Sequence, residues 1–179
     1  SLYEFSDDAS ACAAEYMGWT DLASNPPYPL GDIQAFADDA IAGGLKTVVL
    51  IGQGGSTQAP MTITKYNKVD SGMVSFKTLD SDSPVRVRGI LAEVKPETTL
   101  FIISSKSGGT IEPRLALRAV RNELAECVSE EDLVKRLVAI TDPGSELEKQ
   151  AKEEGWAAVF PGEPTVGGRF SALSVFGLL

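Results

Sequence analysis

The feature that most constrains the fold is an apolar, strand-like run that leads through a glycine-rich loop into a helical pattern, and this arrangement occurs twice. The first run, 45–51, leads into the loop 52–57 and a helix-compatible stretch over 58–66. The second run, 99–103, leads into the loop 104–110 and a helical pattern over 111–128. Such alternation predicts a parallel sheet whose loops meet at the carboxyl ends of its strands.

The rest of the chain continues this alternation. Further helices are predicted over 6–17, 32–42 and 85–94. Two more are predicted from their caps: Ser129 with Asp132 can cap one, and Ser145 forms a capping box with Glu148 at the start of the other. Further strands are predicted over 73–79, 137–140 and 156–160. The expected fold is a three-layer αβα domain with a five-stranded, mostly parallel, doubly wound sheet. It forms one domain over 1–179, with 1–44 as a helical lead-in and 165–179 as the start of a truncated helix.

Composition and charge exclude several classes of function. A length of 179 residues, 43% hydrophobic and 23% charged, suits one globular domain with a sizeable core. The formal net charge of -9 argues against a nucleic-acid partner. Cys12 and Cys127 stand alone and there is no histidine, so no metal site is expected. The chain lacks a signal-peptide pattern and an apolar run of roughly 18 residues, so a cytoplasmic protein outside the membrane is expected.

The second loop has the composition of a phosphate cradle. Its sequence is Ser-Ser-Lys-Ser-Gly-Gly-Thr, and it directly precedes a predicted helix. Hydroxyls and backbone amides donate to phosphate oxygens, the helix dipole favours negative charge, and glycine lets the backbone approach the anion. The alternative is an ordinary turn between strand and helix, in which Thr110 only caps the helix.

A third glycine-containing loop, 165–170, places Arg169 beside a predicted helix start at Ser171. An arginine in this position suits an anionic substrate or a negative charge that develops during a reaction. The alternative is a structural ion pair with a nearby carboxylate such as Glu163.

Neither common nucleotide-binding motif is complete. In the first loop Thr57 stands where a dinucleotide-binding fingerprint needs a third small residue. A P-loop needs a glycine immediately before Lys-Ser or Lys-Thr, and the chain has none. Nucleotide binding is therefore not favoured.

The three loops together resemble the signatures of the glucose-6-phosphate isomerases, which belong to the sugar isomerase (SIS) superfamily. The matching segments are 51–56 for the first glycine loop, 105–113 for the phosphate loop and 166–171 for the arginine motif. Their order and spacing also fit. The wording is similar to that of bacterial forms, some of which are fused behind a transaldolase.

The resemblance implies an enzyme of glycolysis and gluconeogenesis that interconverts glucose 6-phosphate and fructose 6-phosphate through an enediol, without a metal or organic cofactor. It implies that Arg169 stabilises the developing negative charge. The substrate would be held by Gly55, Ser56, Ser105, Lys106, Ser107, Thr110 and Gly168. Gly109 stands where the family often has threonine. A homodimer is expected for the full-length protein.

Members of this family usually continue for hundreds of residues after the arginine motif, and that part carries the glutamate base, a histidine and a lysine. The chain is therefore expected to be the amino-terminal SIS domain of an isomerase and to be inactive by itself. Two other classes of function stay open. The chain could be a non-catalytic SIS module that binds sugar phosphates and regulates a partner, or a structural domain whose loops are only turns.

Overall fold

The computed structural model describes residues 7–67 and 74–179. Within them a sheet of parallel strands runs in the order β2-β1-β3-β4-β5. The strands are β1 (Thr47–Gly52), β2 (Ser75–Leu79), β3 (Thr99–Ser104), β4 (Leu137–Thr141) and β5 (Ala158–Pro161). Each predicted strand is present, and the predicted five-stranded α/β sheet is confirmed.

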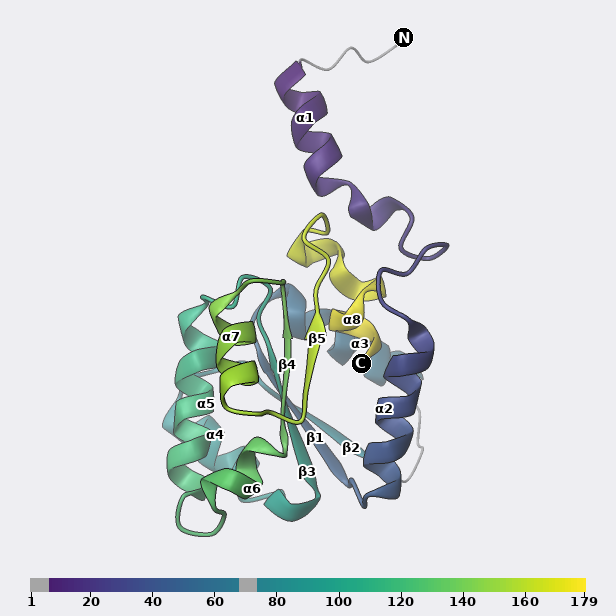
Figure 1. Ribbon diagram of the computed structural model, residues 1–179. Coiled ribbons are helices and arrows are strands. Elements are labelled where there is room, and N and C mark those ends of the chain that lie inside the picture. Colours follow the sequence, from purple (N-terminus) through teal and green to yellow (C-terminus); the bar gives the residue numbers. More distant parts are fainter. Residues whose placement is uncertain (1–6, 68–73) are drawn as a thin grey trace.

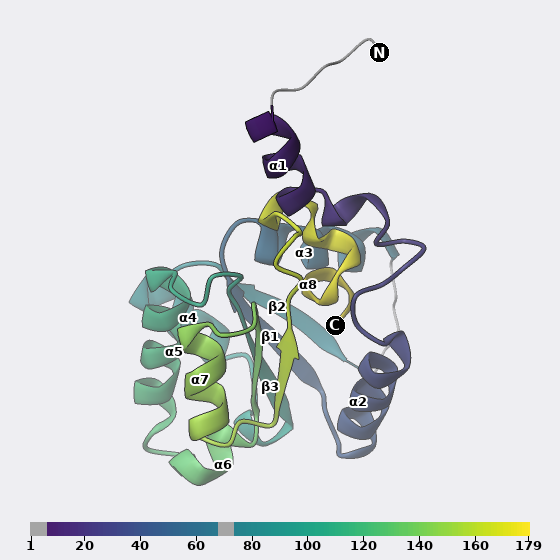
Figure 2. The same ribbon diagram turned by 45° about the horizontal axis from the view of Figure 1, so that its top comes forward.

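Helices cover both faces of the sheet (Figure 1). One face carries α4 (Pro84–Leu91), α5 (Ile111–Leu124), α6 (Glu130–Val134) and α7 (Glu146–Glu153), and the other carries α2 (Leu30–Ala42), α3 (Gly55–Asn67) and α8 (Val175–Leu178). The three-layer prediction is therefore confirmed. Helix α1 (Asp7–Tyr16) projects from the body of the domain (Figure 2). Short 3-10 helices occupy Gly18–Thr20, Pro96–Thr98 and Gly168–Leu173.

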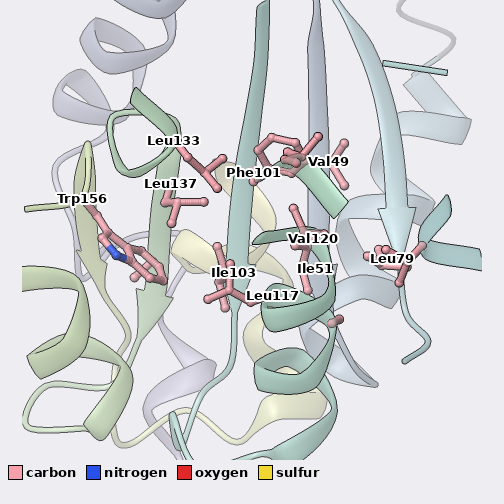
Figure 3. Close-up of a cluster of buried hydrophobic side chains, with 14 of the residues drawn as sticks. Val49, Ile51, Leu79, Phe101, Ile103, Leu117, Val120, Leu133, Leu137 and Trp156 are labelled. Carbon is pink, nitrogen blue, oxygen red and sulfur yellow. The ribbon is translucent and has the colours of Figure 1, made fainter. Parts of the chain in front are cut away.

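The two apolar cores explain why the strand runs are so hydrophobic. All six residues of β3 are buried, because this central strand has helices on both sides. Val49, Ile51, Phe101 and Ile103 belong to the core under α4, α5 and α7. Figure 3 shows them beside Leu117 and Val120 of α5. The opposite core contains Leu50, Ile102 and Phe160 from the strands, and Ile33 and Phe176 from the covering helices. Full burial of a side chain of this size contributes about 1.5–3 kcal/mol.

Strand register brings the first two glycine loops side by side. Ile51 pairs with Ile103, and Gly52, the last residue of β1, pairs with Ser104, the last residue of β3. There is no room for a larger residue at this point, since a β-carbon on Gly52 would lie 2.7 Å from the carbonyl oxygen of Ser104. The loops therefore leave the sheet at the same edge, as predicted.

The predicted helix start at Ser171 is wrong. Ser171 lies inside the 3-10 helix Gly168–Leu173, where its hydroxyl donates to the carbonyl oxygen of Gly168. The hydroxyl of Ser174 instead caps α8 by accepting from the amide of Phe176. Val175 and Phe176, the first two residues of α8, are both buried.

The predicted caps of α6 and α7 are present, with one change of partner. Ser129 accepts from the amide of Asp132, and Ser145 accepts from the amide of Glu148. The Glu148 carboxylate, however, accepts from Gly144 rather than from the cap residue Ser145. The hydrogen bonds from Lys152 and from the Gly144 amide lower the pKa of Glu148 from its ordinary value.

Other boundaries differ only slightly from the predictions. Helix α3 already begins at Gly55, and α5 ends at Leu124 rather than at residue 128. Ser6, the predicted start of the first helix, and Met73, the predicted start of β2, lie outside the described residues.

Candidate functional site

A cavity of about 350 Å³ lies at the carboxyl end of the sheet, where the three predicted loops meet. It contains every predicted substrate-binding residue, whereas Arg169 does not line it. The lining is Gln53, Gly55, Ser56, Ser104, Ser105, Lys106, Ser107, Thr110, Pro113, Asp142 and Gly168. The structure thus gathers residues that are up to 115 positions apart (168 minus 53) into one site.

The amino end of α5 opens onto this cavity without a side-chain cap. Thr110 occupies the N-cap position in extended conformation, but its hydroxyl accepts no hydrogen bond from the first turn. The amides of a first helical turn have no partner within the helix, so they are available to an anion. The interpretation of Thr110 as only a helix cap is therefore not supported. Glu112 lies in the first turn, as predicted.

Ser105 provides an unsatisfied hydroxyl beside that helix end. Ser105 is only 5% exposed, and its Oγ finds no hydrogen-bond partner in the described part of the chain. A buried polar group without a partner costs about 1–3 kcal/mol, which makes such groups rare in folded proteins. A ligand in the cavity would remove this cost by bonding to the hydroxyl.

The first loop has a different role, because the backbone amides of residues 56–58 in the first turn of α3 are already occupied. The backbone amide of Ser56 donates to the carbonyl oxygen of Gln53, and the amides of Thr57 and Gln58 donate to the carbonyl oxygen of Gly54. Gly54 has φ of 58°, a left-handed conformation that favours glycine. This loop therefore offers the cavity the side chain of Ser56 and the bare backbone of Gly55.

The ammonium of Lys106 is held by other loops. Its Nζ lies 2.5 Å from Oδ2 of Asp142, and it also donates to the carbonyl oxygens of Glu163 (3.2 Å) and Pro164 (3.4 Å). Lys106 lines the cavity. Its contacts with Asp142, Glu163 and Pro164 could not be foreseen from the sequence of its own loop. We did not predict from the sequence that Asp142 lies in the site. Its position directly after an apolar strand could have indicated this, because the carboxyl ends of parallel strands meet at one edge of the sheet.

The loop 165–170, here called the arginine loop, packs directly on the first glycine loop. A β-carbon on Gly55 would lie 2.1 Å from the carbonyl oxygen of Gly168, so the two backbones touch. Arg169 follows at the surface, where it is exposed and forms no ion pair with any residue of 7–67 or 74–179. The alternative pairing with Glu163 is not made, since that carboxylate accepts from the amide and hydroxyl of Thr165.

The described residues contain no cluster of three or more histidine, cysteine, aspartate or glutamate side chains able to hold a metal ion. Among the same residues, no helix has the length and apolar character needed to span a membrane.

Comparison with known proteins finds similarity to one enzyme family. A model of the phosphoglucose isomerase family matches residues 33–179. The glucose-6-phosphate isomerase of Synechococcus sp. (strain JA-3-3Ab) is 43% identical over 144 residues, which cover 78% of this chain and 26% of that protein. The chloroplastic glucose-6-phosphate isomerase 1 of Arabidopsis thaliana is 35% identical over 162 residues, which cover 84% of this chain and 26% of that protein.

Solved structures are similar over most of this chain. A hypothetical protein from Thermus thermophilus superposes with a TM-score of 0.80 and 33% identity, over 90% of this chain and 37% of that one. A glucose-6-phosphate isomerase from Chlamydia trachomatis superposes with a TM-score of 0.71 and 25% identity, over 98% of this chain and 31% of that one. The chain spans about a quarter of the length of the two isomerases from Synechococcus and Arabidopsis. Because the family match covers most of its residues, the chain belongs to the phosphoglucose isomerase family.

Proposed function

We propose that this chain forms the phosphate-binding part of a glucose-6-phosphate isomerase. The whole protein would interconvert glucose 6-phosphate and fructose 6-phosphate through an enediol, a step of glycolysis and gluconeogenesis. The observation that carries the proposal is the coincidence, in one cavity, of the uncapped amino end of α5 and the unpartnered hydroxyl of Ser105. Both are donors that a phosphate group can satisfy.

In the proposed complex the phosphate lies against Ser105, Ser107, Thr110 and the amides of their loop. Lys106 supports it through its backbone and positive charge. The first loop contributes Ser56 and lets the substrate approach Gly55, while Gly168 closes the cavity beside it. With the phosphate in this position, the carbon atoms of the sugar would lie toward the arginine loop.

We assign Arg169 to the stabilisation of the negative charge that develops on the enediolate oxygens. Its guanidinium is exposed and has no ionic partner among the described residues, so no carboxylate competes with a substrate for it. It follows Gly168 directly, and Gly168 lines the cavity. A planar, permanently charged fork suits two neighbouring oxygens of a substrate.

The residues of this chain alone do not complete the proposed reaction. Transfer of a proton between the two sugar carbons needs a general base, and ring opening needs an acid. The cavity contains one carboxylate, that of Asp142, which already holds Lys106, and the sequence contains no histidine. We therefore propose that the 179-residue chain binds sugar phosphate but isomerises it negligibly. An assay coupled to glucose 6-phosphate oxidation checks this, and turnover at the rate of family enzymes would contradict it.

We further propose that the complete protein acts in the cytoplasm as a homodimer. A fusion behind a transaldolase, as in some bacterial forms, is the other arrangement that the sequence resemblance suggests. The non-catalytic regulatory module is not favoured, because the family match is to isomerases and the chain retains Arg169.

Nuclear magnetic resonance of the isotopically labelled chain tests the ligand. Titration with glucose 6-phosphate should shift the amide signals of Ser56 and of the loop 105–110. Unphosphorylated glucose is the control and should leave those signals in place, whereas inorganic phosphate should shift the loop 105–110 alone. If millimolar glucose 6-phosphate shifts no amide in either loop of the folded chain, the proposed function is wrong.

A further inference from the structure

Asp142, directly after β4, contacts both the main chain and the side chain of Lys106. Its carboxylate accepts from the Lys106 ammonium at 2.5 Å, and its backbone amide donates to the carbonyl oxygen of Lys106 at 2.9 Å. The hydroxyl of Thr141 donates to the same carbonyl at 3.3 Å. Lys106 is therefore fixed to the tip of β4 through its main chain and its side chain.

The ammonium of Lys106 extends this attachment to the arginine loop. It donates to the carbonyl oxygens of Glu163 and Pro164, which lie between β5 and Gly168. The same segment is bound to β4 by the amide of Gly162, which donates to the carbonyl oxygen of Thr141 at 2.7 Å. One lysine thus connects the phosphate loop, the tip of β4 and the segment that leads to Arg169.

The carboxylate of Asp142 is closely enclosed. A β-carbon on Gly162 would lie 2.5 Å from its Oδ1, and this oxygen has no hydrogen-bond partner within the described part of the chain. Asp142 also lines the cavity that we assign to an anion. A negative charge there opposes phosphate binding, so binding alone does not account for an aspartate at this position.

We infer that Asp142 is a positioning residue, which holds the Lys106 ammonium across the segment 162–164 and so sets the position of Gly168 and Arg169 relative to the phosphate loop. This role rests on the proposed function of the cavity. It predicts that loss of the carboxylate loosens the arginine loop and at the same time makes the cavity more favourable to an anion.

Hydrogen exchange of the ligand-free chain tests the attachment. The reporters are the amides of Gly162 and Val166, which donate to the carbonyl oxygens of Thr141 and Glu163. Asp142→Asn keeps the shape of the side chain and removes its charge. It should speed exchange at both amides about tenfold, because a hydrogen bond between two charged groups is lost.

Lys106→Gln removes the ammonium that contacts the Asp142 carboxylate. This variant replaces Asp142→Asn in the experiment if Asp142→Asn does not fold. The double variant should exchange no faster than Lys106→Gln alone, because we infer that Asp142 acts on this segment through the Lys106 ammonium. Glu93→Gln is the matched control: it removes the pair between Lys77 and Glu93, 2.6 Å apart, at the β2 edge of the sheet. It should leave Gly162 and Val166 unchanged. Unchanged exchange in a folded Asp142→Asn chain, or additive effects in the double variant, would overturn the inference.

Binding and kinetics separate positioning from simple support of the fold. Asp142→Asn should bind inorganic phosphate about three- to tenfold more tightly, because a negative charge leaves the cavity. In the isomerase that we propose, it should lower kcat about tenfold without raising KM for the sugar phosphate. Weaker phosphate binding, or a raised KM at constant kcat, would overturn the role. A wild-type chain that binds no phosphate would instead contradict the proposed function, while the exchange experiment still decides the attachment.

Discussion

The backbones of Gly55 and Gly168 touch, although 113 positions (168 minus 55) separate them in the chain. A β-carbon on Gly55 would lie 2.1 Å from the carbonyl oxygen of Gly168 and 2.6 Å from its carbonyl carbon. The obstacle is main chain rather than a flexible side chain, so a rotamer change cannot relieve it. The contact joins the start of α3 to the arginine loop.

Gly55→Ala should therefore push the arginine loop away and reduce the free energy of unfolding by about 1–3 kcal/mol, the usual range for overpacking. Thermal denaturation measures this loss. The matched control is Gly89→Ala in α4, where an added β-carbon meets nothing within 4 Å and the helix gains from alanine. The control should be neutral or stabilising. Equal stability of the two variants would mean that the two loops do not pack as described.

Ser105→Ala should separate stability from binding. The Ser105 hydroxyl is buried without a partner in the described structure, so its removal should leave the ligand-free chain as stable as before or more stable. Affinity for glucose 6-phosphate should fall about tenfold, because one hydrogen bond to a charged group is lost. Ser104→Ala is the comparison for stability. The Ser104 hydroxyl donates to the carbonyl oxygen of Ser56, so that variant should be less stable. Calorimetry with and without ligand checks both results.

The adjacent glycines Gly108 and Gly109 should respond differently to alanine. Gly108 has φ of 66°, and a β-carbon there would lie 2.7 Å from Cβ of Ser145. Gly108→Ala should reduce the free energy of unfolding by about 1–3 kcal/mol through strain and crowding. At Gly109 the nearest atom, Oγ of Ser107, would lie 4.0 Å away. Gly109→Ala should change stability by less than about 0.5 kcal/mol. Chemical denaturation of the two variants compares them, and a larger loss at Gly109 would contradict the loop geometry.

Arg169→Ala tests the assignment of this arginine in the isomerase that we propose. Arg169 is exposed and has no ionic partner among the described residues, so its replacement should leave stability unchanged. It should lower kcat about 100-fold, the scale for loss of one group that stabilises a developing oxyanion. Arg169→Lys should recover only part of this, because the ammonium keeps the charge but lacks the planar fork. Steady-state kinetics that show a change in KM alone would limit Arg169 to binding.

Most of the fold follows from local patterns. The runs 45–51 and 99–103 are apolar and β-branched because both faces of their strands are covered, and a local window is enough to detect this. Ser129 and Ser145 were recognisable as caps, since the amides that they bond lie three residues further on. The three glycine-rich loops were equally visible, and with them all the residues that we predicted to bind substrate.

The choice between Ser171 and Ser174 could not be made from such windows. Both serines precede apolar residues at helical spacing. Only the packed structure directs the Ser171 hydroxyl to Gly168 and buries Phe176 against the sheet, which places the helix start at Ser174.

The sequence by itself thus determined the order of strands and helices along the chain and the loops whose residues line the cavity, because periodicity, capping and backbone conformation are local properties. The tertiary structure alone decided which distant groups meet. It placed Lys106 on Asp142, brought Gly55 against Gly168, and left the hydroxyl of Ser105 without a partner in the described residues. These contacts depend on strand register and on the packing of three separate loops at one edge of the sheet, which no single stretch of sequence contains.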